Sequence, residues 1–234
     1  MTLDTNRRTK GERSTPGRLE LSVLPSRGRD LRDSVTRRLE KLRAQERKVL
    51  RESLISLACG QTPTAPELAA VLGLAKGRVR EALRALEALD FVALEGDEVR
   101  VAYPFTTGEV PHEVVSSRGV SRTCCAVDAL GVGSMLGETI EVRSRCSHCG
   151  APVRLRGKDR LVGTPEGAIV FIPAVEFVEG RAIEAICPSI NFYCNAEHGR
   201  AQLGGAADRG RFVSLDEAAA MGTAIFGGLL DGLR

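Results

Sequence analysis

The spacing of apolar residues changes along the chain, and this change limits the folds that the sequence can adopt. From Leu31 to Leu57, apolar residues recur mostly every three or four positions, as in a helix that buries one face. Beyond residue 104, short β-type runs such as GETIEVRSRC, APVRLRG and AIVFIPA alternate with Gly and Pro turns. We therefore predict an α+β protein with a mixed, mainly antiparallel sheet and flanking helices, one over residues 125–136 and one from Leu215.

The helical half has the element order of a winged helix. One helix ends at Cys59, two shorter helices joined at Gly73 follow, and an apolar hairpin turns at residues 95–98. We predict a winged-helix-like module over residues 31–104 and an α+β domain over residues 105–234.

The first 30 residues are rich in Arg, Lys, Gly, Ser, Thr and Pro and have little periodic hydrophobicity. Such a segment cannot bury enough apolar surface to offset the entropy lost on ordering, so we predict a flexible basic arm over residues 1–30. The chain contains neither the apolar core of a signal peptide nor a run long enough to span a membrane. We therefore expect a cytoplasmic protein without a membrane partner.

A winged helix suggests DNA binding, because its recognition helix presents basic side chains to the duplex. Four basic residues are available on the second short helix: Lys76, Arg78, Arg80 and Arg84. Acidic residues such as Glu81 and Asp97 surround them, however, so we interpret the module as a packing element and consider nucleic acid an unlikely partner.

Cysteines are concentrated in the second half of the chain. Cys59 stands alone, whereas the other six of the seven lie between residues 124 and 194: Cys124, Cys125, Cys146, Cys149, Cys187 and Cys194. Without a secretion signal these residues are expected to be free thiols that bind metals or act as nucleophiles. The chemistry is therefore expected in the second half.

The CCAVD motif places Cys125 and Asp128 three residues apart at the start of a predicted helix, so that both side chains point to one face. A thiol at a helix N-terminus is expected to have a lowered pKa and to react as thiolate. By itself, such a motif is more often a small apolar Cys with a surface Asp.

Cys146 and Cys149 form a CxxC motif that could bind zinc together with Cys187 and Cys194. The last two thiols lie seven positions apart in a predicted strand and would point to opposite faces, so we expect no zinc site. His112 and His198 have no partner at ligand spacing and are interpreted as loop residues.

The segment TCCAVDALGVGSMLGETIEVRSRCSHCGAPVRLR resembles the central segment of the organomercurial (alkylmercury) lyase family. Two further segments, ICPSINFY and SLDEAAAMG, are similar to the family's second cysteine segment and its closing helix. The family also has a winged-helix-like part before this core, so the resemblance covers roughly residues 31–230. The order of these motifs is more specific than any one of them.

This resemblance implies an enzyme that cleaves carbon–mercury bonds by protonolysis, with residues 105–234 as its catalytic domain. Cys125, Cys187 and Asp128 would be catalytic, the two thiols would hold mercury, and Cys146 would be structural. Hydrocarbon would leave, and Hg(II) would remain as bound product until external thiols or a mercuric reductase accepted it. No dinucleotide fingerprint is present, and no cofactor is expected.

Three positions depart from the family pattern. Cys124 replaces an aromatic residue and is a candidate accessory mercury ligand, Cys149 is an additional thiol, and Pro188 stands where a second Cys is often found. Two alternatives use the same residues differently. In one, the winged helix binds DNA and the cysteines sense a soft metal, which makes the protein a transcriptional regulator. In the other, zinc stabilises an interaction domain.

Overall fold

The computed structural model describes residues 35–174 and 181–233. The predicted basic arm over residues 1–30 lies outside these ranges. Within them, no helix combines the length and the apolar character that a membrane crossing requires.

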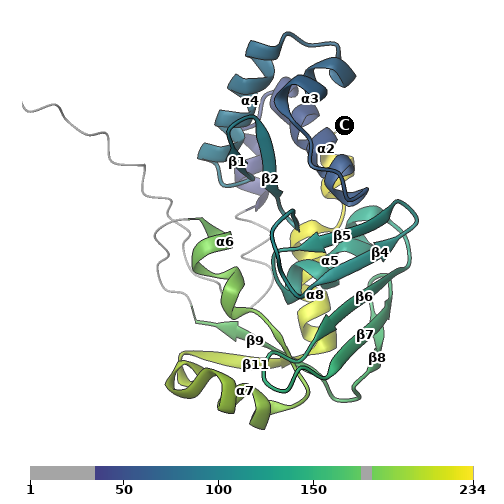
Figure 1. Ribbon diagram of the computed structural model, residues 1–234, viewed down its shortest axis with the longest axis vertical. Helices are drawn as coiled ribbons and strands as arrows, with labels where there is room; N and C mark the ends of the chain where they lie inside the picture. The colour runs from purple at the N-terminus through teal and green to yellow at the C-terminus, as the bar shows by residue number, and fades with distance from the viewer. Residues whose placement is uncertain (1–34, 175–180, 234) are drawn as a thin grey trace, which may run out of the picture.

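In the described N-terminal part, helical residues 35–40 precede three further helices and a hairpin (Figure 1). These later elements are α2 (Ala44–Ala58), α3 (Ala65–Leu72), α4 (Lys76–Ala88), β1 (Val92–Glu95) and β2 (Glu98–Ala102). The predicted continuous first helix is interrupted before Ala44, because Arg43 starts a new helix as its N-cap and the Glu46 carboxylate accepts the Arg43 backbone N–H at 2.8 Å. At the end of α3, Gly73 supplies the left-handed conformation of the C-cap.

An eight-stranded sheet runs through both halves of the protein in the order β1-β2-β3-β5-β4-β6-β7-β8, and every neighbouring pair is antiparallel. The strands beyond the hairpin are β3 (Phe105–Thr106), β4 (Glu113–Ser116), β5 (Gly119–Thr123), β6 (Ile140–Arg145), β7 (Pro152–Gly157) and β8 (Leu161–Thr164). A row of paired, buried residues crosses its centre: Val114, Val142 and Leu155. The predicted α+β fold with a mainly antiparallel sheet is confirmed.

A second, three-stranded sheet has the order β10-β9-β11 and consists of β9 (Ile169–Pro173), β10 (Phe192–Tyr193) and β11 (Gly210–Ser214). Between these strands lie α6 (Ala182–Ala185), the 3-10 helix η1 (Cys187–Ser189), α7 (Ala196–Leu203) and the 3-10 helix η2 (Gly204–Arg209). Figure 1 shows this smaller sheet at the end of the molecule opposite α2–α4.

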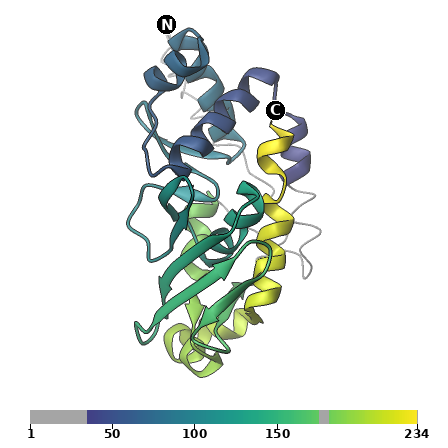
Figure 2. The same ribbon diagram turned by 90° about the vertical axis from the view of Figure 1, so that its right-hand side faces the viewer.

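Two long helices of the second half pack closely against each other: α5 (Ala126–Leu136) and α8 (Leu215–Phe226). Their backbones approach at Gly131 and Gly222, where a Cβ on Gly131 would lie 2.8 Å from the Gly222 carbonyl oxygen. Helix α8 runs alongside the sheet, and the short α9 (Leu229–Gly232) follows it toward α2 (Figure 2). This contact fixes α5, which begins within the CCAVD motif.

Candidate active site

Cys125 lies at the junction between a strand and a helix. Strand β5 ends at Thr123, and Cys125 is the N-cap of α5. Its sulfur accepts the backbone N–H of Asp128 at 3.5 Å, in the place where a Ser or Asp oxygen often caps a helix. Asp128 is in the first turn of α5, so the cap and the carboxylate lie on the same side of the helix.

Cys187 reaches the same place from η1. The carbonyl of Ile190, just after η1, accepts the backbone N–H of Ala126 at 3.0 Å, which joins this segment to the start of α5. The Cys187 thiol donates to Oδ2 of Asp128 at 3.9 Å. The ligand atoms of Cys125, Asp128 and Cys187 all lie within 4.8 Å of one another. The structure therefore brings together the three residues that the resemblance implied.

Burial controls the electrostatics of this thiol–carboxyl cluster, the group formed by Cys125, Asp128 and Cys187. The three residues are only 3%, 6% and 6% exposed. Burial raises the pKa of Asp128 to about 7, although hydrogen bonds with Cys125 and Cys187 lower it in part. A carboxyl group with this pKa can both accept and donate a proton near neutral pH.

The expectation of a lowered Cys125 pKa was wrong. Burial, the contact with Cys187 and the nearby Asp128 raise the pKa of Cys125 well above its ordinary value. The hydrogen bond with Cys125 lowers the pKa of Cys187, but burial and Asp128 outweigh it and raise that pKa to about 11. The helix N-terminus is too weak to compensate for such burial, so both thiols are protonated at neutral pH.

Two residues that the sequence analysis did not single out hold the segment before Cys187. Oδ2 of Asp90 accepts the backbone N–H of Ala182 at 3.2 Å. The Tyr103 hydroxyl donates to Oδ1 of Asp90 at 3.3 Å and accepts the backbone N–H of Ile183 at 2.8 Å. The only signal in the sequence is an Asp between apolar neighbours at the end of α4, which is not specific.

An ion pair adds to this contact. Arg181 lies 2.7 Å from Glu87 of α4, and both side chains are partly buried. The N-terminal helices and hairpin therefore position α6 and, through it, Cys187. Figure 1 shows α6 between this N-terminal part and the smaller sheet.

Cys124 is buried next to Cys125, but its sulfur is not among the grouped ligand atoms of the described residues. Its thiol is 3.6 Å from the Phe105 carbonyl oxygen, to which it donates. The neighbouring position in the sequence is therefore not sufficient to place this thiol in the thiol–carboxyl cluster.

The remaining candidate ligands form a separate group. Cys146, Cys149, Cys194 and His198 lie together, whereas Cys187 does not belong to this group. Cys187 and Cys194 therefore point to different places, as expected. The alternating faces of a strand are not the reason, because Cys187 lies in η1.

The interpretation of His198 as a loop residue was wrong, because it lies in α7 with its ring against Cys146. His112 does lie in a loop, before β4, but it is buried and contacts Ser144.

Two thiols beside a carboxyl group define a site that can bind a soft metal ion and deliver a proton next to it. A sequence model of the alkylmercury lyase family matches residues 105–227, which is more than half of the chain. The chain belongs to the alkylmercury lyase family.

Among solved structures, the chain is similar to the one described as "Crystal structure of the mercury-bound form of MerB2", with a TM-score of 0.71 and 20% identity. The match covers 87% of this chain and 98% of the other. No curated protein sequence matches the chain. Family membership makes the protein an enzyme that cleaves carbon–mercury bonds and not the transcriptional regulator considered as an alternative.

Proposed function

We propose that Cys125, Asp128 and Cys187 carry out the cleavage of carbon–mercury bonds. The observation that supports this assignment most strongly is the Asp128 carboxyl group, which is buried within 4.8 Å of both sulfurs. Sulfur is the ligand that a soft ion such as mercury prefers, and the carboxyl group is the nearest carrier of a proton.

Substrate capture begins with exchange of ligands on mercury. For a substrate R–Hg–X, one thiol replaces X, and its proton leaves with X as HX. Binding of the second thiol to mercury releases a second proton, because a metal-bound sulfur is deprotonated. Asp128 accepts this proton, since the Cys187 thiol already donates to its carboxylate in the resting enzyme.

Cleavage then uses the proton held by Asp128. The carboxyl group transfers it to the carbon bound to mercury, and the electron pair of the carbon–mercury bond becomes the new carbon–hydrogen bond. The hydrocarbon RH leaves, and Hg(II) stays on the two sulfurs. Mercury keeps its oxidation state throughout, so the reaction needs no redox cofactor.

Product release requires other thiols. Free thiols in solution exchange with Cys125 and Cys187 for Hg(II), and a mercuric reductase is a chemically suitable acceptor of this product.

All seven cysteines are free thiols, and such thiols persist in a reducing compartment, which supports a cytoplasmic location.

The N-terminal part serves, in this proposal, as a winged-helix-like module over residues 31–104 that packs against a catalytic domain over residues 105–234. Its contacts to the segment before Cys187 support a positioning role. Arg80, one of the basic residues that would face DNA, is paired instead with Asp97 at 2.6 Å. This pair supports a module that does not bind nucleic acid.

The decisive experiment measures methane in the headspace above the protein, methylmercury and excess free thiol. Cys125→Ser and Cys187→Ser are each expected to abolish turnover while circular dichroism remains unchanged, because mercury loses one sulfur ligand. Cys59→Ser is the matched control, since Cys59 belongs to neither cluster. Full methane release by either active-site variant would remove that cysteine from the mechanism.

A further inference from the structure

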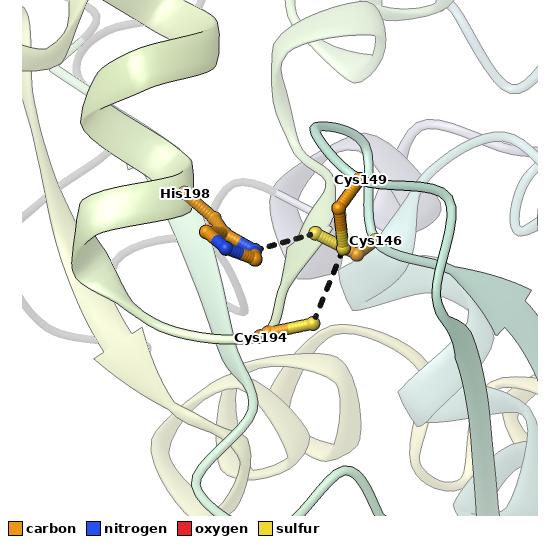
Figure 3. A group of neighbouring side chains, drawn as sticks. All are labelled: Cys146, Cys149, Cys194 and His198. Carbon is orange, nitrogen blue, oxygen red and sulfur yellow. Dashed lines mark hydrogen bonds between the residues drawn. The ribbon is translucent and has the colours of Figure 1, made fainter.

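The second group of ligands is assembled from three separate parts of the chain. Cys146 and Cys149 lie in the turn after β6, Cys194 follows β10, and His198 is in α7. Figure 3 shows the three sulfurs and the His198 ring pointing toward one another. All four ligand atoms lie within 4.8 Å of one another.

The distances between these atoms agree with a tetrahedral zinc site. With Zn–S distances of about 2.3 Å and Zn–N distances of about 2.0–2.1 Å, a tetrahedron separates two sulfurs by about 3.8 Å and sulfur from nitrogen by about 3.6 Å. The sulfurs of Cys149 and Cys194 are 3.7 Å apart, and the Cys146 sulfur is 3.6 Å from Nδ1 of His198. A disulfide would require a sulfur–sulfur distance of about 2.05 Å, and all these cysteines are free.

Backbone hydrogen bonds hold the CxxC turn at its first cysteine. The N–H of Gly150 donates to the Cys146 carbonyl oxygen at 2.9 Å, and Gly150 has a φ of 72°, which favours glycine. The Cys146 N–H donates in turn to the Ala151 carbonyl oxygen at 2.8 Å. These contacts orient the first ligand, as hydrogen bonds around a metal site commonly do.

His198 is oriented by the start of its helix. Asn195 is the N-cap of α7, and its side chain accepts the backbone N–H of His198 at 2.9 Å. Because Asn195 directly follows Cys194, one short turn places both a sulfur and an imidazole in the group. The third and fourth ligands therefore have a defined geometry as well.

We propose that Cys146, Cys149, Cys194 and His198 bind one Zn²⁺ ion in a structural site that is separate from the thiol–carboxyl cluster. Three thiolates and one imidazole are a typical ligand set for zinc, and four protein ligands leave no open position for a substrate. The group contains no carboxylate, so it lacks the proton carrier that carbon–mercury cleavage needs.

The position of the site explains what the ion would stabilise. The strands of the smaller sheet contribute Val170, Phe192 and Val213 to the main core. Next to the proposed ligands lies a separate, small core of three buried residues, Cys146, Phe171 and Tyr193. A core of this size contributes little stability, and small structural units are often stabilised by a metal ion. The ion would join β6 of the large sheet to β10 and α7, next to the backbone hydrogen bond of 2.9 Å from Ser147 to Phe192.

The test is elemental analysis of the full chain, expressed with added zinc and purified without chelators. The wild-type protein is expected to contain about one zinc per chain, and Cys149→Ser/Cys194→Ser is expected to lose it. Two controls, Cys59→Ser and the double variant Cys125→Ser/Cys187→Ser, are expected to keep it. Zinc missing from the wild type even after addition, or zinc lost from the active-site double variant, would overturn the proposal.

Replacement of zinc by Co²⁺ tests the ligands directly. The wild type is expected to show thiolate-to-cobalt charge transfer and the intense visible bands of tetrahedral cobalt, and His198→Ala is expected to shift the visible bands. Chelation of zinc is expected to lower the melting temperature of the wild type and to leave that of Cys149→Ser/Cys194→Ser unchanged. Cobalt bands without thiolate character would contradict the assignment. These measurements do not depend on turnover, so their outcome is independent of the proposed catalytic residues.

Discussion

The Cys187 thiol donates to the Asp128 carboxylate at 3.9 Å, although the two residues are separated by 59 positions in the sequence. In the proposed mechanism, this contact joins a metal ligand to a proton carrier before any substrate binds. Because burial raises the pKa of both groups, the proton that the proposed cleavage needs is already present in the resting site.

Asp128→Asn separates proton transfer from mercury binding. The amide has nearly the shape of the carboxyl group but cannot donate its proton, so methane release is expected to fall by roughly 10²–10⁴-fold. Hg(II) affinity, measured by competition with a thiol chelator, is expected to remain because both sulfurs are present. Unchanged methane release would exclude the proton role, and lost mercury affinity would instead make Asp128 a ligand.

The same variant is expected to change the pH dependence of stability. The pKa of Asp128 rises from an ordinary value of 3.8 to about 7 on folding, so the folded protein holds this proton more tightly than the unfolded chain. This tighter proton binding adds to the free energy of unfolding. Its contribution is complete below the unfolded pKa and is lost as the pH rises through about 7. At pH 8 the ionised, buried carboxylate costs on the order of 4 kcal/mol.

Asp128→Asn removes this titration. The variant is therefore expected to be more stable than the wild type at about pH 8, and its advantage should shrink by about 2–3 kcal/mol at about pH 5. Urea unfolding at both pH values measures the difference. An advantage that does not vary with pH would show that Asp128 is not raised in pKa.

Gly222→Ala tests the packing that holds α5, the helix that begins at Cys125 and contains Asp128. A Cβ at this position would lie 2.7 Å from the Gly131 nitrogen and from the Val127 carbonyl oxygen, so α5 and α8 would have to separate. We expect a loss of about 1–3 kcal/mol in the free energy of unfolding. Gly77→Ala is the matched control, because Gly77 is also helical but its Cβ would meet nothing within 4 Å. Equal stability of the two variants would contradict the close approach.

Cys124→Ala tests whether the neighbouring thiol is an accessory mercury ligand. Since the Cys124 thiol donates to the Phe105 carbonyl oxygen, we expect turnover and mercury stoichiometry close to those of the wild type. Stability should fall by about 1 kcal/mol for the lost buried atom. Steady-state methane release and mercury titration measure the two quantities. A loss as large as that of Cys125→Ser would assign Cys124 to the site.

The sequence by itself determined the features that depend on local spacing and residue type. The change of apolar period predicted the helices, the hairpin and the antiparallel strands, because each period reports which face of an element is buried. The CxxD spacing placed Cys125 and Asp128 on one side of a helix. The family followed from the order of several motifs, which the match over residues 105–227 confirms.

Only the tertiary structure decided which distant residues meet and how deeply they are buried. The spacing of Cys187 and Cys194 could not show that one joins Asp128 and the other joins His198. Cys187 lies in η1 beside the start of α5, whereas Cys194 follows β10 and directly precedes the N-cap of α7. The pKa of Cys125 was predicted in the wrong direction because the helix N-terminus is a local feature, whereas desolvation depends on every element that covers the thiol. The support of Cys187 by Asp90 and Tyr103 likewise depends on contacts between segments that lie far apart in the chain.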